Sequence, residues 1–265
     1  IMLGTMSAQV TRVVGPAAAG VMIGISVIGI AGVYWVSAVL SLIAVGLSVT
    51  LPEGAPRFVR DSGPFEDLKE GIRYTRSKPE LVRLLVMSLG VVMFGFAHQA
   101  FLPTVVADLF DRSAGSLGLL TTVAAVGAVI TSVALANTPR EQLRQRQNTA
   151  AYVFGGAIIL FAVMPNFGLA LGAMFVVGCG MSAFQSLNGS LILSSADMEY
   201  HGRVQSLIML SFSAFGLAAL PFGVIADRVG LRETMASMGV AVILTAAHST
   251  WWRRRIVAAR IPDPL

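Results

Sequence analysis

Charged side chains are scarce in this chain of 265 residues. Asp, Glu, Lys and Arg make up only 12% of it, against about a quarter of an ordinary soluble domain, whereas hydrophobic residues make up 55%. A water-soluble core does not hide that much apolar surface. The composition therefore excludes an ordinary soluble protein and predicts that most of the chain is surrounded by lipid.

Cysteine is almost absent, and the motifs of common catalytic sites are missing. The single cysteine, Cys179, lies within an apolar stretch, which excludes a disulfide framework and a cysteine metal site. There is no Gly-x-Ser-x-Gly elbow, no His-Glu-x-x-His, no phosphate-binding loop and no dinucleotide fingerprint. We therefore expect no enzymatic activity, no cofactor and no resident metal.

Long runs without charge mark the places where the chain crosses a membrane, because one crossing needs about 20 apolar residues. Forty residues without charge follow Arg12 and 50 follow Arg146, and each of these runs is long enough for two crossings. Four shorter runs each suit one crossing: 84–107, 113–139, 204–226 and 234–252. The sequence thus predicts an all-α, polytopic membrane protein with eight transmembrane helices.

Each of the two longest runs must contain a reversal of the chain. The first helix must begin near Gly4 and carry Arg12 inside it, because the apolar residues that follow Arg12 are too few for a separate span. We expect its reversal at Gly29 to Gly32, and the reversal of the second long run at Pro165-Asn166.

Basic residues are distributed unevenly between the loops. When successive loops are assigned to opposite sides of the membrane, one side holds 15 of the 19 Lys and Arg residues, and the other holds Arg112, Arg228 and Arg232. Since basic loops are retained in the cytoplasm, we expect both chain ends on the cytoplasmic side. We expect the membrane to be a bacterial inner (plasma) membrane. The net charge of +5 is therefore a topology signal, and no nucleic-acid partner is expected.

One sizeable polar segment, residues 52–80, interrupts the apolar pattern. Phe65, Leu68 and Ile72 recur in it at helical spacing with charges between them, and Pro64 suits the first turn of a helix. This predicts a short amphipathic helix that lies flat on the cytoplasmic membrane surface. A solvated linker helix without a partner is the equal alternative.

Polar side chains inside the spans are the candidates for a transport site, since an amide or charge in hydrocarbon costs roughly 2 kcal/mol or more unless it faces a partner or water. We expect five of them to contact a substrate in a central cavity: Arg12, His98, Gln99, Gln185 and Asn188. Alternatives stay open for two of them. For His98 the alternative is a neutral histidine bonded across a helix interface. For Arg12 the alternatives are snorkelling to the membrane surface and an ion pair with a helix missing from this chain.

Other residues are candidates for gating. Gly15 and Pro16 weaken a helix locally and predict a hinge or a tight crossing, with packing alone as the alternative. At the membrane faces, Gly202-Arg203 and Asp227-Arg228 predict gates or plain loops, and for Arg203 the expected partner is Asp197 or Glu199.

Three groups of residues resemble the major facilitator superfamily. The run Arg12-Val13-Val14-Gly15-Pro16, with Gly20 after it, is similar to the antiporter signature on the fifth helix of that family. The stretch from Asp67 to Leu81 is similar to the loop joining helices six and seven in the branch of enterobactin exporters, or transmembrane secretion effectors. The runs 202–207 and 226–230 resemble the eleventh helix of that branch and its ends.

This resemblance implies a fold of twelve helices, of which the chain carries helices 5 to 12 and lacks the first four. Residues 1–51 are then the last two helices of the amino-terminal bundle, 52–80 the cytoplasmic linker with its amphipathic helix, and 81–265 the six-helix carboxy-terminal bundle. It also implies a secondary active transporter that works by alternating access of two bundles.

We therefore expect a proton-coupled exporter of a small amphipathic molecule, such as a drug or siderophore. No Asp or Glu lies in the middle of a span, so the proton carrier is expected in the missing amino-terminal helices or at His98. A lipid translocator of the same fold is one alternative, and it should show a side opening between helices with basic groups at headgroup depth. A non-transporting truncated remnant is the other.

Overall fold

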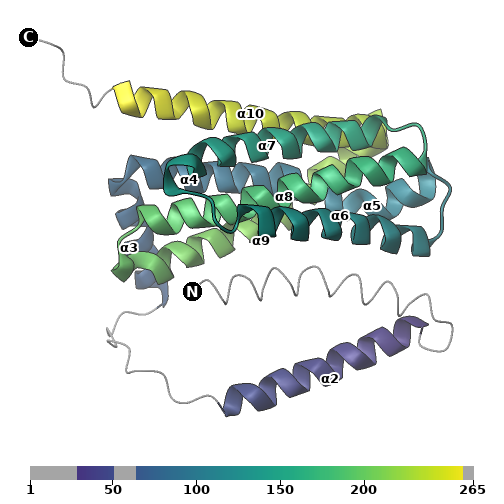
Figure 1. Cartoon of the computed structure of the whole chain (residues 1–265), viewed down its shortest axis with the longest axis horizontal. Helices are drawn as coiled ribbons and strands as arrows, with labels where there is room; N and C mark the ends of the chain where they lie inside the picture. Colours follow the sequence, from purple (N-terminus) through teal and green to yellow (C-terminus); the bar gives the residue numbers. More distant parts are fainter. Residues whose placement is uncertain (1–28, 51–63, 259–265) are drawn as a thin grey trace, which may run out of the picture.

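The computed structural model of the chain describes residues 29–50 and 64–258, which are helical apart from short connections (Figure 1). In chain order the elements are α2 (Gly29–Val49), α3 (Pro64–Ser77), α4 (Pro79–Gly90), η1 (Val91–Phe96), α5 (His98–Thr104), η2 (Val105–Leu109), α6 (Ala114–Leu135), α7 (Arg140–Val163), α8 (Phe167–Ser195), η3 (Met198–Tyr200), α9 (His201–Val229) and α10 (Leu231–Ala258). The predicted all-α class is confirmed for these residues, and seven of the eight expected spans fall on them.

Four of the described helical stretches are long and apolar enough to cross a membrane by length and composition: Pro79–Leu109, Ala114–Leu135, Phe167–Ser195 and Met198–Val229. The helices α7 and α10, with 24 and 28 residues, are equally long but carry charges at their ends. Such charges suit helix ends at headgroup depth, where long basic side chains reach water.

The six long helical segments after residue 78 form one bundle (Figure 1). In it α7 packs between α8 and α10, α6 packs against α8, and α9 packs against α4 and η1. Large side chains fill the interior, among them Phe154, Phe161 and Phe184, each at most 1% exposed. Because lipid provides no hydrophobic drive between helices, this close packing is what holds them together.

Glycines set the closest helix crossings. A Cβ on Gly178 of α8 would lie 1.9 Å from the backbone oxygen of Ala124 in α6, which leaves no room for any other residue. Between α7 and α10, Gly155 and Gly239 face each other's carbonyl oxygens, and a Cβ on either would come within 2.7 Å of them. Small residues at these points let the backbones approach as helices in membranes require.

The stretch Pro79–Leu109 is one long helical rod that is not α-helical throughout. The π-helical segments η1 and η2 lie on either side of α5, and Pro103 lies inside α5. Proline has no N–H to donate, and a π turn accommodates one extra residue, so the side chains beyond η1 are rotated relative to a continuous α-helix. The sequence pattern predicted one crossing over residues 84–107 and carried no signal for the π turns.

The two expected chain reversals have different outcomes. The reversal at Pro165-Asn166 is confirmed, because α7 ends at Val163 and the Asn166 side chain caps α8 by accepting the Leu169 N–H at 3.0 Å. The reversal at Gly29 to Gly32 is wrong, since α2 begins at Gly29 and these residues are already helical.

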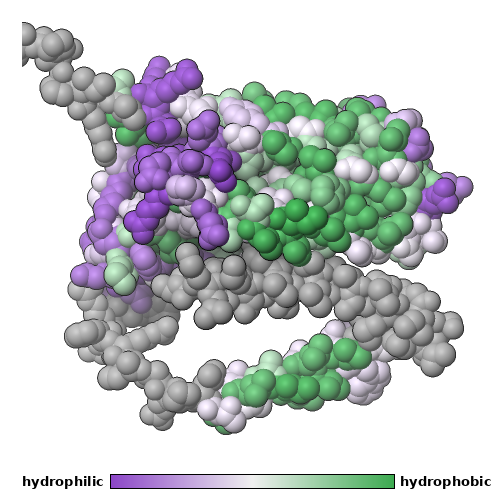
Figure 2. All heavy atoms as spheres, viewed as in Figure 1, coloured by the Kyte–Doolittle hydropathy of each residue, from purple (hydrophilic) through white to green (hydrophobic). Residues whose placement is uncertain are grey.

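Hydrophilic side chains gather at one end of the bundle, while its flank is largely apolar (Figure 2). We call this the basic end: it holds α3, the starts of α4, α7 and α9, and the end of α10. The described Lys and Arg residues here are Lys69, Arg73, Arg76, Lys78, Arg83, Arg140, Arg144, Arg146, Arg203, Arg253, Arg254 and Arg255. An apolar flank between polar ends is the surface expected of a protein in a bilayer.

Candidate functional site

Gln99 and Gln185 lie on the same side of the bundle. The exposed Gln99 side chain on α5 donates from Nε2 to the sulfur of Met181 on α8, at 3.7 Å. Gln185 follows Met181 by one helical turn and is half-buried. These three residues, which we call the glutamine face, place two amides and a thioether at the open surface of α5 and α8.

His98 and Asn188 point into the bundle instead. His98 is 1% exposed, its Nδ1–H donates to the Gly95 carbonyl, and its ring packs edge-to-face against Phe154 of α7 at 5.9 Å. Asn188 is also buried, and its Oδ1 accepts a 2.6 Å hydrogen bond from Gln147 of α7. The His98 side chain therefore holds α5 against α7, and the Asn188 side chain holds α8 against α7.

His98 and Gln99 point in different directions because neighbouring positions of a helix lie about 100° apart around its axis, and η1 affects which of the two is turned inward. η1 ends at Phe96, so the side chains that follow it are displaced around the helix axis relative to Val91 and Val92. The imidazole is turned into the core and the neighbouring amide is exposed. Sequence reasoning treated the two residues as a pair although neighbouring helical positions do not share a face, and it had no signal for the π turn.

Two polar pairs inside the bundle were missed by sequence reasoning. One is the Gln147–Asn188 bond, and the other joins Ser132 of α6 to Ser182 of α8, whose hydroxyls are 2.8 Å apart. Gln147 had a recognisable signal, because it is an amide at the start of a long apolar run. Paired polar groups of this kind stabilise helix contacts in lipid by roughly 0.6 kcal/mol each.

The helix α3 is held against the start of α9 by a set of polar and aromatic contacts, which we call the α3 clamp. Its members are Asp67, Glu70, Tyr74 and Lys78 on one side and Asp197, Tyr200 and Arg203 on the other. The Arg203 guanidinium reaches both acidic side chains, at 2.8 Å from Asp67 and 3.0 Å from Glu70. The predicted helix is thus present, and it has partners within the chain, contrary to the alternative of a helix without a partner. Its position on the cytoplasmic membrane surface stays a prediction.

Aromatic stacking and a second ion pair complete the clamp. The rings of Tyr74 and Tyr200 stack with centroids 3.8 Å apart and planes 2° from parallel. Lys78 Nζ lies 2.7 Å from Asp197, whose backbone N–H donates to the Tyr74 hydroxyl at 2.8 Å. The expected pairing of Arg203 with Asp197 or Glu199 is therefore wrong, because α3 supplies the partners of Arg203 and Lys78 takes Asp197.

The Lys78–Asp197 bond shifts both groups in the direction that preserves the ion pair. Its hydrogen bond lowers the pKa of Asp197 and raises that of Lys78 from their ordinary values. A carboxyl with a lowered pKa stabilises the folded state above its unfolded pKa and loses that contribution as the pH falls through its folded pKa. The pair is accordingly intact at neutral pH; it weakens in acid, below the ordinary range of Asp197, and in alkali, above the ordinary range of Lys78.

The α3 clamp leads to a first prediction. Replacing Arg203 by glutamine removes the cation that both carboxylates share, so α3 should open more often and its backbone amides should exchange with deuterium about tenfold faster. Hydrogen exchange of the peptide covering α3, measured on the protein in detergent, tests this. Arg254→Gln is the matched control, since this exposed arginine lies at the same end and should leave exchange in α3 unchanged.

The remaining predicted gating residues are placed as follows. Gly202 is exposed, and a Cβ on it would meet nothing within 4 Å. Asp227 and Arg228 are exposed near the end of α9 opposite the basic end, and within the described part of the chain the structure gives neither an ion pair. Three candidates, Arg12, Gly15 and Pro16, lie outside the described residues.

A buried ion-pair network at the basic end was not anticipated. Arg83 of α4 is 1% exposed and binds Glu80 through two hydrogen bonds of 2.9 and 3.1 Å. It also donates to the Ser249 hydroxyl of α10 at 2.6 Å, and Arg144 of α7 approaches Glu80 at 3.4 Å. Glu80 thus ties α4 to α7 and Arg83 ties α4 to α10, and we call these four residues the Glu80 network.

Comparisons with known proteins agree with this architecture. The model of the Major Facilitator Superfamily matches residues 3–219. The staphyloferrin A transporter of Staphylococcus aureus (strain NCTC 8325 / PS 47) is 23% identical over 236 residues, which cover 89% of this chain. The match covers 59% of the length of that transporter, so the chain corresponds to less than two thirds of it.

Proposed function

Because this chain belongs to the major facilitator superfamily, we propose that it serves a proton-coupled exporter of a small amphipathic molecule of the drug or siderophore class. The family makes it a multi-pass membrane protein of a transporter family, not an enzyme family. The direction of transport, the coupling to protons and the cargo are our proposal. The name of the staphyloferrin A transporter supports a siderophore as the first cargo to test.

The glutamine face is the observation that carries this proposal. Most buried side chains of the bundle are apolar, whereas Gln99, Met181 and Gln185 present neutral hydrogen-bonding groups at an open surface. An amide both donates and accepts, and methionine adapts to irregular apolar shapes. Such a surface suits a cargo that carries many oxygen atoms on an apolar frame. We therefore place the cargo at the glutamine face, with His98 and Asn188 packed behind it.

Alternating access would move the bundle formed by residues 81–258 against the helices that precede it. Residues 64–77 travel with this bundle, because the α3 clamp ties α3 to α9. We propose that the basic end lies in the cytoplasm of a bacterial cell, with both chain ends on that side of the inner membrane, because basic groups are concentrated there. Other groups of the protein would then carry the protons, because the glutamine face contains no titratable side chain.

Efflux measurements on the complete open reading frame, expressed in cells that lack other exporters, test the glutamine face. Replacing either Gln99 or Gln185 by alanine should lower the transport rate of a siderophore cargo about tenfold, since a hydrogen bond to a charged cargo is worth roughly 1.5–3 kcal/mol. Asn137→Ala removes an exposed amide between α6 and α7 and should leave transport unchanged. Normal efflux by both glutamine variants, at equal protein levels, would remove the face from the transport path.

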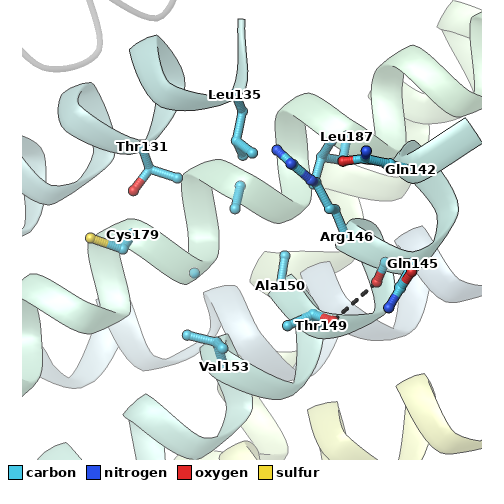
Figure 3. Close-up of a pocket in the computed structure, with 12 residues that line it drawn as sticks. Thr131, Leu135, Gln142, Gln145, Arg146, Thr149, Ala150, Val153, Cys179 and Leu187 are labelled. Atoms are coloured by element: carbon cyan, nitrogen blue, oxygen red, sulfur yellow. Dashed lines mark hydrogen bonds between the residues drawn. The ribbon is translucent and has the colours of Figure 1, made fainter. Parts of the chain in front are cut away.

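The second candidate, a lipid translocator, is favoured by one observation. A groove opens on the side of the bundle between α6 and α7, and Arg146 lines it near the basic end of the bundle (Figure 3). It is lined by α6, α7 and α8 and includes neither Gln99 nor Gln185, so we retain export as the proposal. Movement of a labelled phospholipid between leaflets, with no efflux of any soluble cargo, would favour the translocator. Loss of both activities would favour the non-transporting alternative.

A further inference from the structure

The groove between α6 and α7 has a volume of about 590 Å³, which is within the range of about 300–1,000 Å³ typical of small-molecule sites (Figure 3). Residues of α6 and α7 form its walls, and residues of α8 form its floor. The lining side chains are Thr131, Leu135, Gln142, Gln145, Arg146, Thr149, Ala150, Val153, Cys179, Gly180, Ala183 and Leu187. It is a site separate from the glutamine face.

Polarity changes along the length of the groove. Gln142 and Arg146 line it near the start of α7, at the basic end, whereas Val153 lies further along the same helix. Eleven residues separate Gln142 from Val153, which corresponds to about 16 Å along an α-helix. This is about half of the 30 Å hydrocarbon thickness of a bilayer. The groove therefore extends through one leaflet, from headgroup depth to the middle of the bundle.

The floor of the groove is formed by α8, where two of the four lining residues are small: Gly180 and Ala183. A Cβ on Gly180 would come within 2.7 Å of the Phe154 backbone, so the close approach of α7 and α8 requires glycine at this position. The floor is thus set by the helix crossing, and the groove is shaped for a thin apolar chain.

Arg146 is the charged group at the mouth of the groove. Its side chain is exposed, and the structure gives it one hydrogen-bond partner in the described part of the chain, the Thr138 hydroxyl at 3.2 Å. A guanidinium carries five N–H donors and binds phosphate oxygens in pairs, so most of its donors remain for a ligand. Because Arg146 lies near the start of α7, at the basic end, it should be at the level of the lipid headgroups.

From this arrangement we propose that the groove binds one acyl chain of an anionic glycerophospholipid whose phosphate is held by Arg146. The lipid is a resident of the bundle, not its cargo. It fills the space that α6 and α7 leave between them, so its binding should also make the bundle harder to unfold. The inference is independent of the proposed export function, because it rests on a different face of the protein.

Cys179 offers a direct test, since it lines the groove and is the single cysteine of the chain. The full chain in detergent is treated with N-ethylmaleimide in the presence of phosphatidylglycerol, phosphatidylcholine or inorganic phosphate. Phosphatidylglycerol should slow the alkylation of Cys179. The Arg146→Gln variant should need about tenfold more phosphatidylglycerol for the same degree of protection. Arg140→Gln, which removes an exposed arginine outside the lining, should behave as the wild type does.

A second variant tests the position of the acyl chain. Val153 is 41% exposed on the groove wall, so Val153→Trp should fill the groove without disturbing the core and abolish the effect of added lipid. Equal protection by phosphatidylcholine, whose phosphate is balanced by a quaternary ammonium group, would overturn the preference for an anionic lipid. An unchanged lipid requirement in Arg146→Gln would overturn the phosphate contact. Equal protection by inorganic phosphate would overturn the acyl-chain site, and so would protection that survives Val153→Trp or is absent in the wild type.

Discussion

Replacing Glu80 by alanine should destabilise the folded bundle by about 3–5 kcal/mol, because it leaves a buried cation without its counterion. The Arg83 side chain is 1% exposed and has Glu80 as its acidic partner at 2.9 Å. After the change, only the Ser249 hydroxyl would remain among the hydrogen-bond acceptors that the structure gives Arg83. The unfolding midpoint in detergent, followed by circular dichroism, measures the loss of stability. The amount of protein that accumulates in membranes is a second measurement.

Two further variants separate the buried charge from a general effect of removing an acid. Glu141→Ala removes an exposed carboxylate from the first turn of α7 at the same end and should change stability by well under 1 kcal/mol. The double variant Glu80→Met with Arg83→Met removes both charges, and it should be more stable than Glu80→Ala alone. A double variant as unstable as the single one would show that shape, not charge, holds this network together.

Gly178→Ala is expected to have the second large effect, a loss of about 1–3 kcal/mol or more from overpacking. The new Cβ would lie 1.9 Å from the backbone oxygen of Ala124, and neither backbone can yield without shifting α6 relative to α8. The Cys179–Gly127 contact, 3.4 Å from sulfur to carbonyl oxygen, lies in the same crossing and should be broken. The same unfolding assay applies, and the rate of Cys179 alkylation reports the shift of α6 locally.

Gly172→Ala is the matched control for this crossing. Gly172 is in the same helix, but a Cβ there would meet nothing within 4 Å. Because alanine loses less backbone entropy than glycine in a helix, Gly172→Ala should leave stability unchanged or raise it by up to about 1 kcal/mol. A loss of similar size in both variants would contradict the assignment of Gly178 to a tight crossing.

The sequence was sufficient for the helices because its signals there are local. Charge-free runs located the spans that the structure describes, and Pro64 and Asn166 marked the starts of α3 and α8 correctly. The same reasoning failed at Gly29 to Gly32, where glycines were read as a turn although the residues belong to α2. Several glycines near a helix end do not show on which side of them the helix begins.

The candidate site depended on information that the sequence does not carry locally. Tyr74 and Asp197 are 123 positions apart, so the α3 clamp arises only when the bundle places α9 beside α3. Carboxylates near Arg203 in the sequence were favoured as its partners, but the fold brings Asp67 closer in space. His98 and Gln99 were treated as a pair although neighbouring helical positions lie about 100° apart; which of the two is buried depends on the packing of the bundle and on the π turn before them.

The π turns before and after α5 also determine how a change in the length of this segment is absorbed. A π turn is one residue longer than an α-helical turn, so deleting one residue within Val91–Phe96 would convert it to an α-helical turn and leave the side chains beyond it facing as before. His98 would keep its contact with Phe154. In a continuous α-helix the same deletion would rotate every later position by about 100°, so this segment tolerates the loss of one residue more easily than the other long helices do.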